Sequence, residues 1–303
     1  MTKLNVDGQT IEISNKDKLF FPDAGITKGD LIDYYRRIAQ TILPYMQERP
    51  LSMQRFPDGI EGEGFYQKQV PDYFPDWIDQ VSVKVKEDET EQFQVVCNNA
   101  ATLVYLANQA CITPHLWLSR QDKLDYPDRL IFDLDPPGDD FESVRFAAQL
   151  LREALEEVGL TPLVMTTGSR GLHVVTPLDR QADFDSVRAF ARELVELLAN
   201  REPDRLTVEP RKNKRKGRLF LDYLRNAYAQ TATAPYAVRA KPGAPVATPL
   251  DWHELNNSEL HSQQYNLGNI FRRLSQKTDP WQGKMDQTGS LAQAQRQFKA
   301  NNQ

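Results

Sequence analysis

Between residues 129 and 224 the sequence alternates short apolar runs with amphipathic stretches, and their order constrains the fold more than any other feature. Apolar runs at residues 129–135, 163–167, 172–176 and 218–224 predict strands. Residues 141–158 and 185–199 carry apolar side chains at helical spacing and predict two helices. The resulting order is strand, helix, strand, strand, helix, strand. This is the order of the split βαβ or ferredoxin-like unit, so we expect an α/β (α+β) fold.

This arrangement places several acidic side chains on one face of the predicted sheet. Right-handed crossovers place the first strand of such a unit between the third and the fourth. Because side chains two residues apart share a face, Asp133 and Asp135 point the same way, and Asp222 and His173 meet them from the neighbouring strands. Gathered carboxylates repel each other unless a cation lies among them, and hard divalent cations prefer oxygen ligands. The sequence therefore predicts a site for two metal ions of the kind that catalyses phosphoryl displacement. The alternative for Asp133 and Asp135 alone is an ordinary strand end before a Pro-Pro turn.

The predicted turn at residues 166–173 carries two glycines, three hydroxyl side chains, Arg170 and His173. Glycine lets backbone N–H groups approach an anion, and arginine binds phosphate oxygens with two hydrogen bonds. Taken alone, the segment is equally typical of a plain hairpin. Beside the acidic cluster it predicts a triphosphate site, to which Arg215 and Arg218 would add positive charge.

Charge is distributed unevenly along the 303 residues, although the formal net charge is only −5. Residues 201–241 contain 11 Lys+Arg and 4 Asp+Glu, which leaves 26 positive and 38 negative side chains elsewhere. A solvated loop is the ordinary explanation of such a basic run, and binding of a polyanion is the functional one. Two cysteines, no long apolar run and no apolar leader at the amino terminus lead us to expect a cytoplasmic protein with reduced thiols and no membrane partner.

Three motifs with the expected spacing resemble the archaeo-eukaryotic primase superfamily: Ile-Phe-Asp-Leu-Asp-Pro at 131–136, Gly-x-x-Gly-Leu-His at 168–173 and Phe-Leu-Asp-Tyr-Leu-Arg-Asn at 220–226. Within it, the chain is most similar to the polymerase domains of bacterial DNA ligase D, which act in non-homologous end joining. The similarity extends from residue 15 to residue 255 and includes the segments 51–59, 64–68, 115–120 and 234–239.

The resemblance implies a primase-like fold, in which a split βαβ (RRM/ferredoxin-like) catalytic module is packed with an N-terminal mixed α/β module. We predict an N-terminal α/β module with DNA contacts over residues 1–115, the catalytic module over 116–250, and C-terminal helices with a polar, frayed tail over 251–303. The implied activity is template-dependent nucleotidyl transfer with two Mn²⁺ or Mg²⁺ ions and a preference for ribonucleotides. It would fill gaps and extend DNA ends.

The resemblance also implies roles for single residues. Asp133, Asp135 and Asp222 match the catalytic metal ligands. The positions that match nucleotide-binding residues are His115, Thr167, Arg170, His173, Arg215 and Arg239. The positions that match DNA contacts are Asn15, Lys18 and Lys28 for a 5′-phosphate and Phe65 and Tyr66 for the template strand.

These roles have ordinary structural alternatives. Phe65 and Tyr66 would be core residues, His115 a half-buried strand histidine, and Lys18 and Lys28 solvated side chains. Family members usually have Lys-Thr-Ser-Gly where this chain has Met165-Thr-Thr-Gly, Lys where it has Arg170, and Ser where it has Ala237.

The implied partners are DNA with a gap or 3′ overhang and a 5′-phosphate, NTP or dNTP, and, from the family context, a Ku-like end-binding protein and an ATP-dependent DNA ligase. The chain lacks the Lys-x-Asp-Gly nucleotidylation motif and has only four histidines. We therefore expect it to polymerise without sealing, with sealing either supplied in trans or located on a longer protein.

Three other interpretations compete with this one. A haloacid-dehalogenase-type phosphatase also uses Asp-x-Asp, but it needs Thr or Val where this chain has Pro137. An RNA-recognition module would place aromatic residues, not carboxylates, on the open sheet face. A non-catalytic, primase-like nucleic-acid-binding subunit is the remaining alternative.

Overall fold

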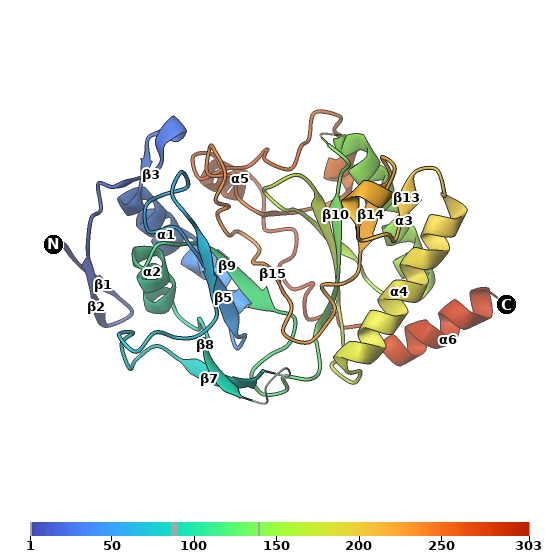
Figure 1. The fold of residues 1–303 in the computed structure, drawn as a ribbon, viewed down its shortest axis with the longest axis horizontal. Helices are drawn as coiled ribbons and strands as arrows, with labels where there is room; N and C mark the ends of the chain where they lie inside the picture. The colour runs from blue at the N-terminus through green and yellow to red at the C-terminus, as the bar shows by residue number, and fades with distance from the viewer. Residues whose placement is uncertain (1, 86–89, 139, 303) are drawn as a thin grey trace. The chain divides into compact units, whose positions relative to one another are not determined.

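The computed structural model describes residues 2–85, 90–138 and 140–302. The chain forms two compact units, each assembled from separate stretches of sequence (Figure 1). Unit 1 comprises residues 1–122, 231–247 and 265–273, and unit 2 comprises residues 123–230, 248–264 and 274–303. This division into compact units differs from the three consecutive segments predicted above. The assignment of separate functions to those three segments stays a prediction.

Unit 2 is built on a mainly antiparallel sheet of six strands. The strand order is β13 (Leu206–Thr207), β14 (Leu219–Asp222), β10 (Arg129–Asp135), β12 (Leu172–Pro177), β11 (Leu163–Thr166) and β16 (Thr248–Leu250). Only β13 and β14 run parallel. The central strand β10 lies between β12 and β14, which is the place that the crossover rule predicts for the first strand.

Helices α3 (Phe141–Glu157) and α4 (Phe184–Arg201) pack against this sheet and contact each other (Figure 1). Each begins where the side chain of an aspartate, Asp140 or Asp183, accepts a hydrogen bond from a backbone N–H in the first turn. The apolar stripe of α3 is buried, as are Leu130, Phe132 and Leu134 of β10. Burial of these side chains fixes the face of β10 that remains for the acids.

The carboxyl-terminal end differs from the polar, frayed tail that we expected within residues 251–303. Residues Leu291–Asn301 form helix α6, in which Leu291 and Ala294 are buried. The ring of Phe298 lies 5.9 Å from the ring of Phe190 on α4 in an edge-to-face contact. The polar composition of this segment concealed a narrow apolar stripe sufficient to hold one helix. Asp251 begins only the short 3₁₀ helix η3 (Trp252–Asn256).

Unit 1 contains a four-stranded antiparallel sheet in the order β15 (Thr231–Thr233), β9 (Cys111–Trp117), β5 (Leu51–Arg55) and β6 (Phe65–Gln67). Three hairpins accompany it: β1 (Thr2–Val6) with β2 (Gln9–Ile13), β3 (Leu19–Phe21) with β4 (Ile26–Thr27), and β7 (Gln80–Lys84) with β8 (Glu91–Val95). Helix α1 (Lys28–Met46) lies beside α2 (Ala100–Asn108), and α5 (Ile270–Gln276) begins in this unit (Figure 1). The pairing of β15 with β9 joins segments more than a hundred residues apart in sequence.

Both units combine helices with antiparallel sheets, so the fold is mixed α/β. Across the described ranges, no helix has the length and apolar character that crossing a membrane would require.

Candidate active site

The acidic residues predicted to converge lie on neighbouring strands of unit 2. Asp133 on β10 is directly opposite Asp222 on β14 and directly opposite His173 on β12. Residues directly opposite each other in an antiparallel pair point to the same face, so these three side chains lie in one row. Asp135 is two residues further along β10, opposite Phe220. The structure thus brings Asp133, Asp222 and His173 together and places Asp135 at the next position along the same face.

Arginine side chains donate hydrogen bonds to two of these carboxylates. Arg225 Nη2 donates to Asp133 Oδ2 at 3.3 Å, and His173 Nε2 lies 3.6 Å from Asp133 Oδ1. Arg170 Nη2 donates to Asp135 Oδ2 at 3.4 Å. The Asp133 side chain is only 12% exposed, whereas that of Asp135 is 43% exposed. Asp133 is therefore the buried centre of the cluster and Asp135 its open edge.

The crowding of the two carboxylates affects the pKa of Asp222. Burial raises the pKa of its carboxyl group above the ordinary value, and the nearby charge of Asp133 raises it further. A hydrogen bond from the backbone N–H of Leu224 to Asp222 Oδ1, 2.8 Å long, opposes this rise, as do the charges of Arg225 and Arg215. The site therefore favours any cation that can lie between the two carboxylates.

The residues present fit a divalent cation by the chemistry of their donor atoms. Mg²⁺ and Mn²⁺ take carboxylate oxygens, and the paired Asp133 and Asp222 repel each other unless a positive charge intervenes. Within residues 2–85, 90–138 and 140–302, however, no three His, Cys, Asp or Glu side chains are gathered as in a formed metal cage. In this structure Arg225 and Arg170 donate to the carboxylates of Asp133 and Asp135.

The glycine turn after β11 is held closed by its own hydrogen bonds. Thr167 Oγ1 accepts from the backbone N–H groups of Ser169 and Gly171, at 3.2 and 3.3 Å. Ser262 Oγ donates to Gly171 O at 2.8 Å and lies 3.1 Å from Thr167 Oγ1. Thr167 therefore shapes the turn, and Arg170, which is exposed, is the side chain of the turn that extends toward the acids.

Two glycines of this turn are required by geometry. Gly168 has a φ of 64°, in the left-handed region. At Gly171 an added Cβ atom would lie 1.7 Å from the carbonyl oxygen of Leu134. Only glycine lets the turn approach β10 this closely, next to Asp135.

The basic segment before β14 contains one arginine with a fixed role. Arg215 donates to the carbonyl oxygens of Glu209 and Pro210, and its guanidinium lies 4.3 Å from the centre of the Phe220 ring. Its lysine neighbours Lys212, Lys214 and Lys216 are exposed. Arg215 thus anchors the segment to β14, while the lysines present positive charge to solvent.

In unit 1 the predicted phosphate-binding residues lie at the base of the β3–β4 hairpin, where α1 begins. The backbone N–H groups of Lys18 and Lys28 donate to Asn15 O and Lys18 O, at 3.0 and 2.8 Å, and these bonds bring the three residues together. Lys28 Nζ is buried and donates to Ser14 O at 2.7 Å, so Lys28 is not solvated. Burial, followed by the charge of Lys18, lowers the pKa of Lys28 to about 8. Lys18 forms an ion pair with Asp58.

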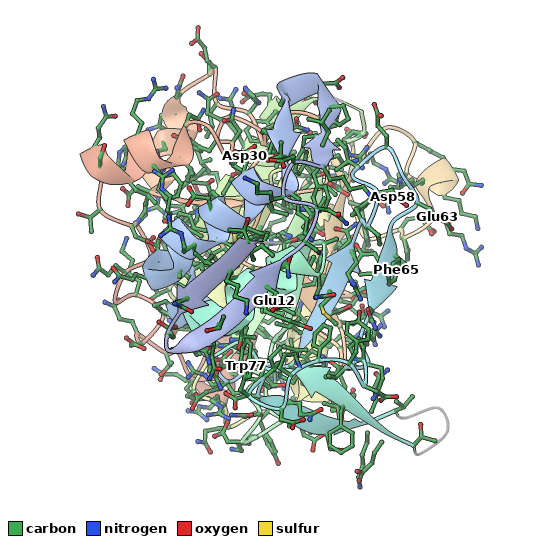
Figure 2. The ribbon with its side chains drawn as sticks, turned by 90° about the vertical axis from the view of Figure 1, so that its left-hand side faces the viewer. Glu12, Asp30, Asp58, Glu63, Phe65 and Trp77 are labelled. Atoms are coloured by element: carbon green, nitrogen blue, oxygen red, sulfur yellow. The ribbon has the colours of Figure 1, made fainter. Side chains whose placement is uncertain are left out.

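The aromatic residues predicted to meet the template lie on β6, at the edge of the unit 1 sheet. Phe65 is 44% exposed and Tyr66 is 59% exposed, which contradicts the alternative that they are core residues. Figure 2 shows Phe65 on this edge strand, with Glu63 beside it. The Tyr66 ring lies 5.3 Å from the ring of His115, which is buried on β9. Arg239, half-buried after β15, lies in the same unit.

Sequence reasoning missed three residues that organise the unit 2 site: Arg225, Asn226 and Ser262. Arg225 and Asn226 follow Asp222 within the motif at residues 220–226, so their position next to the acid was the available signal. Ser262 belongs to a segment without periodicity, and no local pattern connects it to residue 171.

Carboxylates on neighbouring antiparallel strands, beside a glycine turn and arginine side chains, are the arrangement expected of a nucleotidyltransferase domain of the primase-polymerase class. The comparisons with known proteins agree. The family described as LigD, primase-polymerase domain, matches residues 27–281. The chain belongs to this family.

Among curated proteins, the multifunctional non-homologous end joining protein LigD of Pseudomonas aeruginosa is 33% identical over 274 residues, which cover 89% of this chain and 32% of that protein. The bifunctional LigD of Bacillus subtilis is 30% identical over 273 residues, covering 89% of this chain and 43% of that protein. The chain thus spans less than half the length of these relatives. Among solved structures, the polymerase domain of Mycobacterium tuberculosis ligase D in complex with DNA matches with a TM-score of 0.85 and 27% identity, over 92% of this chain and 99% of that one.

Proposed function

We propose that this chain is a template-dependent nucleotidyltransferase that fills gaps and extends DNA ends during non-homologous end joining, with a preference for ribonucleotides. The observation that carries the proposal is the pairing of Asp133 with Asp222 across β10 and β14. Two carboxylates face each other there beside a glycine turn and a basic segment. Family membership and the likeness to a polymerase domain solved with DNA support the same activity.

In this proposal Asp133, Asp135 and Asp222 are the catalytic residues and hold two Mn²⁺ or Mg²⁺ ions. Such ions, when bound, neutralise the triphosphate and activate the primer 3′-hydroxyl as a nucleophile. The protein contributes the fixed separation of Asp133 and Asp222, set by the β10–β14 register. His173 and Arg225, which both lie beside Asp133, orient its carboxylate.

Roles in binding the incoming nucleotide are assigned within each unit separately. In unit 2 we assign the triphosphate to Arg170, His173, Arg215 and the turn that Thr167 closes. Arg170 makes a single hydrogen bond to Asp135 and is exposed, so it can turn to phosphate oxygens, which it binds with two hydrogen bonds. In unit 1 we assign His115 to binding of a nucleotide sugar and Arg239 to nucleotide binding.

DNA contacts are assigned to unit 1. Two lysines that repel each other at the amino-terminal end of α1 favour an anion, and helix amino termini add positive potential there. Asn15, Lys18 and Lys28 would therefore bind a 5′-phosphate. Exposed Phe65 and Tyr66 would stack on template bases, because base stacking needs solvent-facing rings.

The finer fold and the cellular context belong to the same proposal. The order β10, α3, β11, β12, α4, β14 supports a split βαβ catalytic module of the primase type. A Ku-like end-binding protein and an ATP-dependent ligase are the expected partners, because the relatives are end-joining proteins of greater length. A cytoplasmic, nucleoid-associated location follows from that role.

The test is extension of a labelled primer across a short gap with a downstream 5′-phosphate, with Mn²⁺ and either NTPs or dNTPs. Wild-type protein is compared with Asp133→Ala/Asp135→Ala and with Glu153→Gln, which removes an exposed charge on α3. We expect template-directed addition by wild type and by Glu153→Gln, and loss of more than about a hundredfold in the double variant.

Absence of addition by wild-type protein with every metal and nucleotide would overturn the catalytic proposal. Binding of the same gapped DNA without addition would then support the second candidate, a primase-like subunit that binds nucleic acid. The observation that favours this candidate is the exposure of Phe65 and Tyr66 on β6, because exposed aromatic rings can stack on bases whether or not the protein is catalytic.

A further inference from the structure

The side-chain amide of Asn226 is buried and fully hydrogen-bonded next to the acidic cluster. Asn226 is 0% exposed. Its Oδ1 accepts from the backbone N–H of Ile131 at 2.9 Å, and its Nδ2 donates to Ile131 O at 2.7 Å and to Tyr223 O at 2.9 Å. A single side chain thus joins strand β10 to the turn that follows β14.

These side-chain hydrogen bonds extend the β10–β14 pairing beyond the point where its backbone hydrogen bonds end. Strand β14 pairs with β10 only as far as Asp222, opposite Asp133. In an antiparallel ladder the next hydrogen-bonded residue of β10 is Ile131. The amide of Asn226 supplies to Ile131 both bonds that a continued β14 would have made. It does so while the backbone itself turns away at Tyr223.

The turn fixed in this way sets the groups around Asp133. Within it the backbone N–H of Leu224 donates to Asp222 Oδ1 at 2.8 Å, which orients the Asp222 carboxylate. The next residue, Arg225, donates to Asp133 Oδ2 at 3.3 Å. Both interactions depend on where the turn lies against β10, and the Asn226 amide determines that position.

We propose that Asn226 is a positioning residue for the acidic pair. It touches neither substrate nor ion, and it fixes the place of the Asp222 carboxylate relative to that of Asp133. The inference rests on the proposed function only in taking this pair as ligands of a divalent cation. Outer groups that orient metal ligands typically change metal affinity by 10- to 100-fold when they are removed.

A buried asparagine in unit 1 provides the matched control. Asn108 at the end of α2 accepts from the backbone N–H of Ser14 at 3.3 Å and donates to Glu12 O at 2.9 Å. It therefore makes the same kind of bridge between a backbone N–H and a backbone carbonyl. Its substitution removes similar hydrogen bonds without involving the acids.

The experiment measures Mn²⁺ binding to the whole chain directly, by the loss of the free Mn²⁺ paramagnetic resonance signal during titration. The variants are Asn226→Ala, Asn226→Asp and Asn108→Ala, each also unfolded in urea to record its stability. Asn226→Asp preserves the shape of the side chain and removes the two N–H donors. This variant provides the Mn²⁺ affinity measurement if Asn226→Ala does not fold. The Mn²⁺ dependence of primer extension is recorded in parallel at saturating nucleotide.

We expect the Asn226 variants to weaken Mn²⁺ binding about tenfold or more and to shift the Mn²⁺ requirement of extension by the same factor. Asn108→Ala should lose comparable stability with unchanged Mn²⁺ affinity. Wild-type Mn²⁺ affinity in folded Asn226 variants would overturn the inference and leave the polymerase proposal intact. A wild-type protein that binds no Mn²⁺ and adds no nucleotide would overturn both.

Discussion

Lys28 is buried at the start of α1, and its pKa is lowered to about 8 by burial and by the charge of Lys18. In the unfolded chain its pKa is near the ordinary 10.5. Between these values the unfolded state binds the additional proton, so the free energy of unfolding should rise as the pH increases from about 8 toward 10.5. The check is urea unfolding across this range for wild type and Lys28→Met, in which the rise attributable to Lys28 should disappear. An identical pH dependence in both proteins would contradict the buried position.

The same lysine should govern recognition of a 5′-phosphate. Replacing Lys18 or Lys28 with Ala removes one charge-assisted hydrogen bond, so stimulation of gap filling by the phosphate should fall about tenfold. In wild type the stimulation should decrease above pH about 8, where Lys28 loses its proton. Extension on gaps with and without the phosphate measures both effects. Lys16→Ala, which changes an exposed neighbour, should retain the stimulation.

The turn between β11 and β12 acts as one element whose shape depends on Gly171. A Cβ at this position would overlap the carbonyl of Leu134, so Gly171→Ala must move either the turn or β10. We expect a loss of about 1–3 kcal/mol or more in the free energy of unfolding, together with weaker nucleotide binding. Urea unfolding and nucleotide titration measure these effects. Gly268→Ala is the control, because only the side-chain oxygen of Asn266 lies near an added Cβ there, and it should change neither the free energy of unfolding nor nucleotide binding. Unchanged stability and nucleotide binding in Gly171→Ala would contradict the prediction.

At the level of elements, periodicity and chain handedness were sufficient to predict β10 between its neighbours and Asp133 opposite Asp222. Those features repeat over several residues, and the crossover rule leaves few arrangements. The bonds of Asn226 and Arg225 were not predictable, because they depend on the geometry of one turn. Ser262 reaches the glycine turn from a stretch of irregular backbone, and the buried stripe of α6 is too narrow to stand out from a polar tail.

Across the whole molecule, residues 201–241 concentrate positive charge on a chain that is acidic elsewhere. Exposed Lys212, Lys214 and Lys216 should release counterions when DNA binds. Their replacement by Gln should reduce the slope of log affinity against log salt by about 0.9 for each phosphate that is no longer neutralised. Fluorescence anisotropy with gapped DNA at several NaCl concentrations measures the slope. Gln at Arg188, Arg192 and Lys299, equal in charge and also exposed, is the control and should leave the slope unchanged.

The discontinuous composition of the two units has a consequence for synthesis of the protein in the cell. Strand β9 of unit 1 can pair with β15 only after the ribosome has made residues 231–233, and unit 1 is complete only at residue 273. Most of unit 2, including both acid-bearing strands, is translated in between. Domains usually mature one after another from the amino terminus during translation. Here unit 1 is finished only after residues 123–230 of unit 2 have been made. A ribosome stalled at residue 230 would therefore carry a unit 2 that still lacks residues 248–264 and 274–303 and a unit 1 whose sheet still has an open edge at β9.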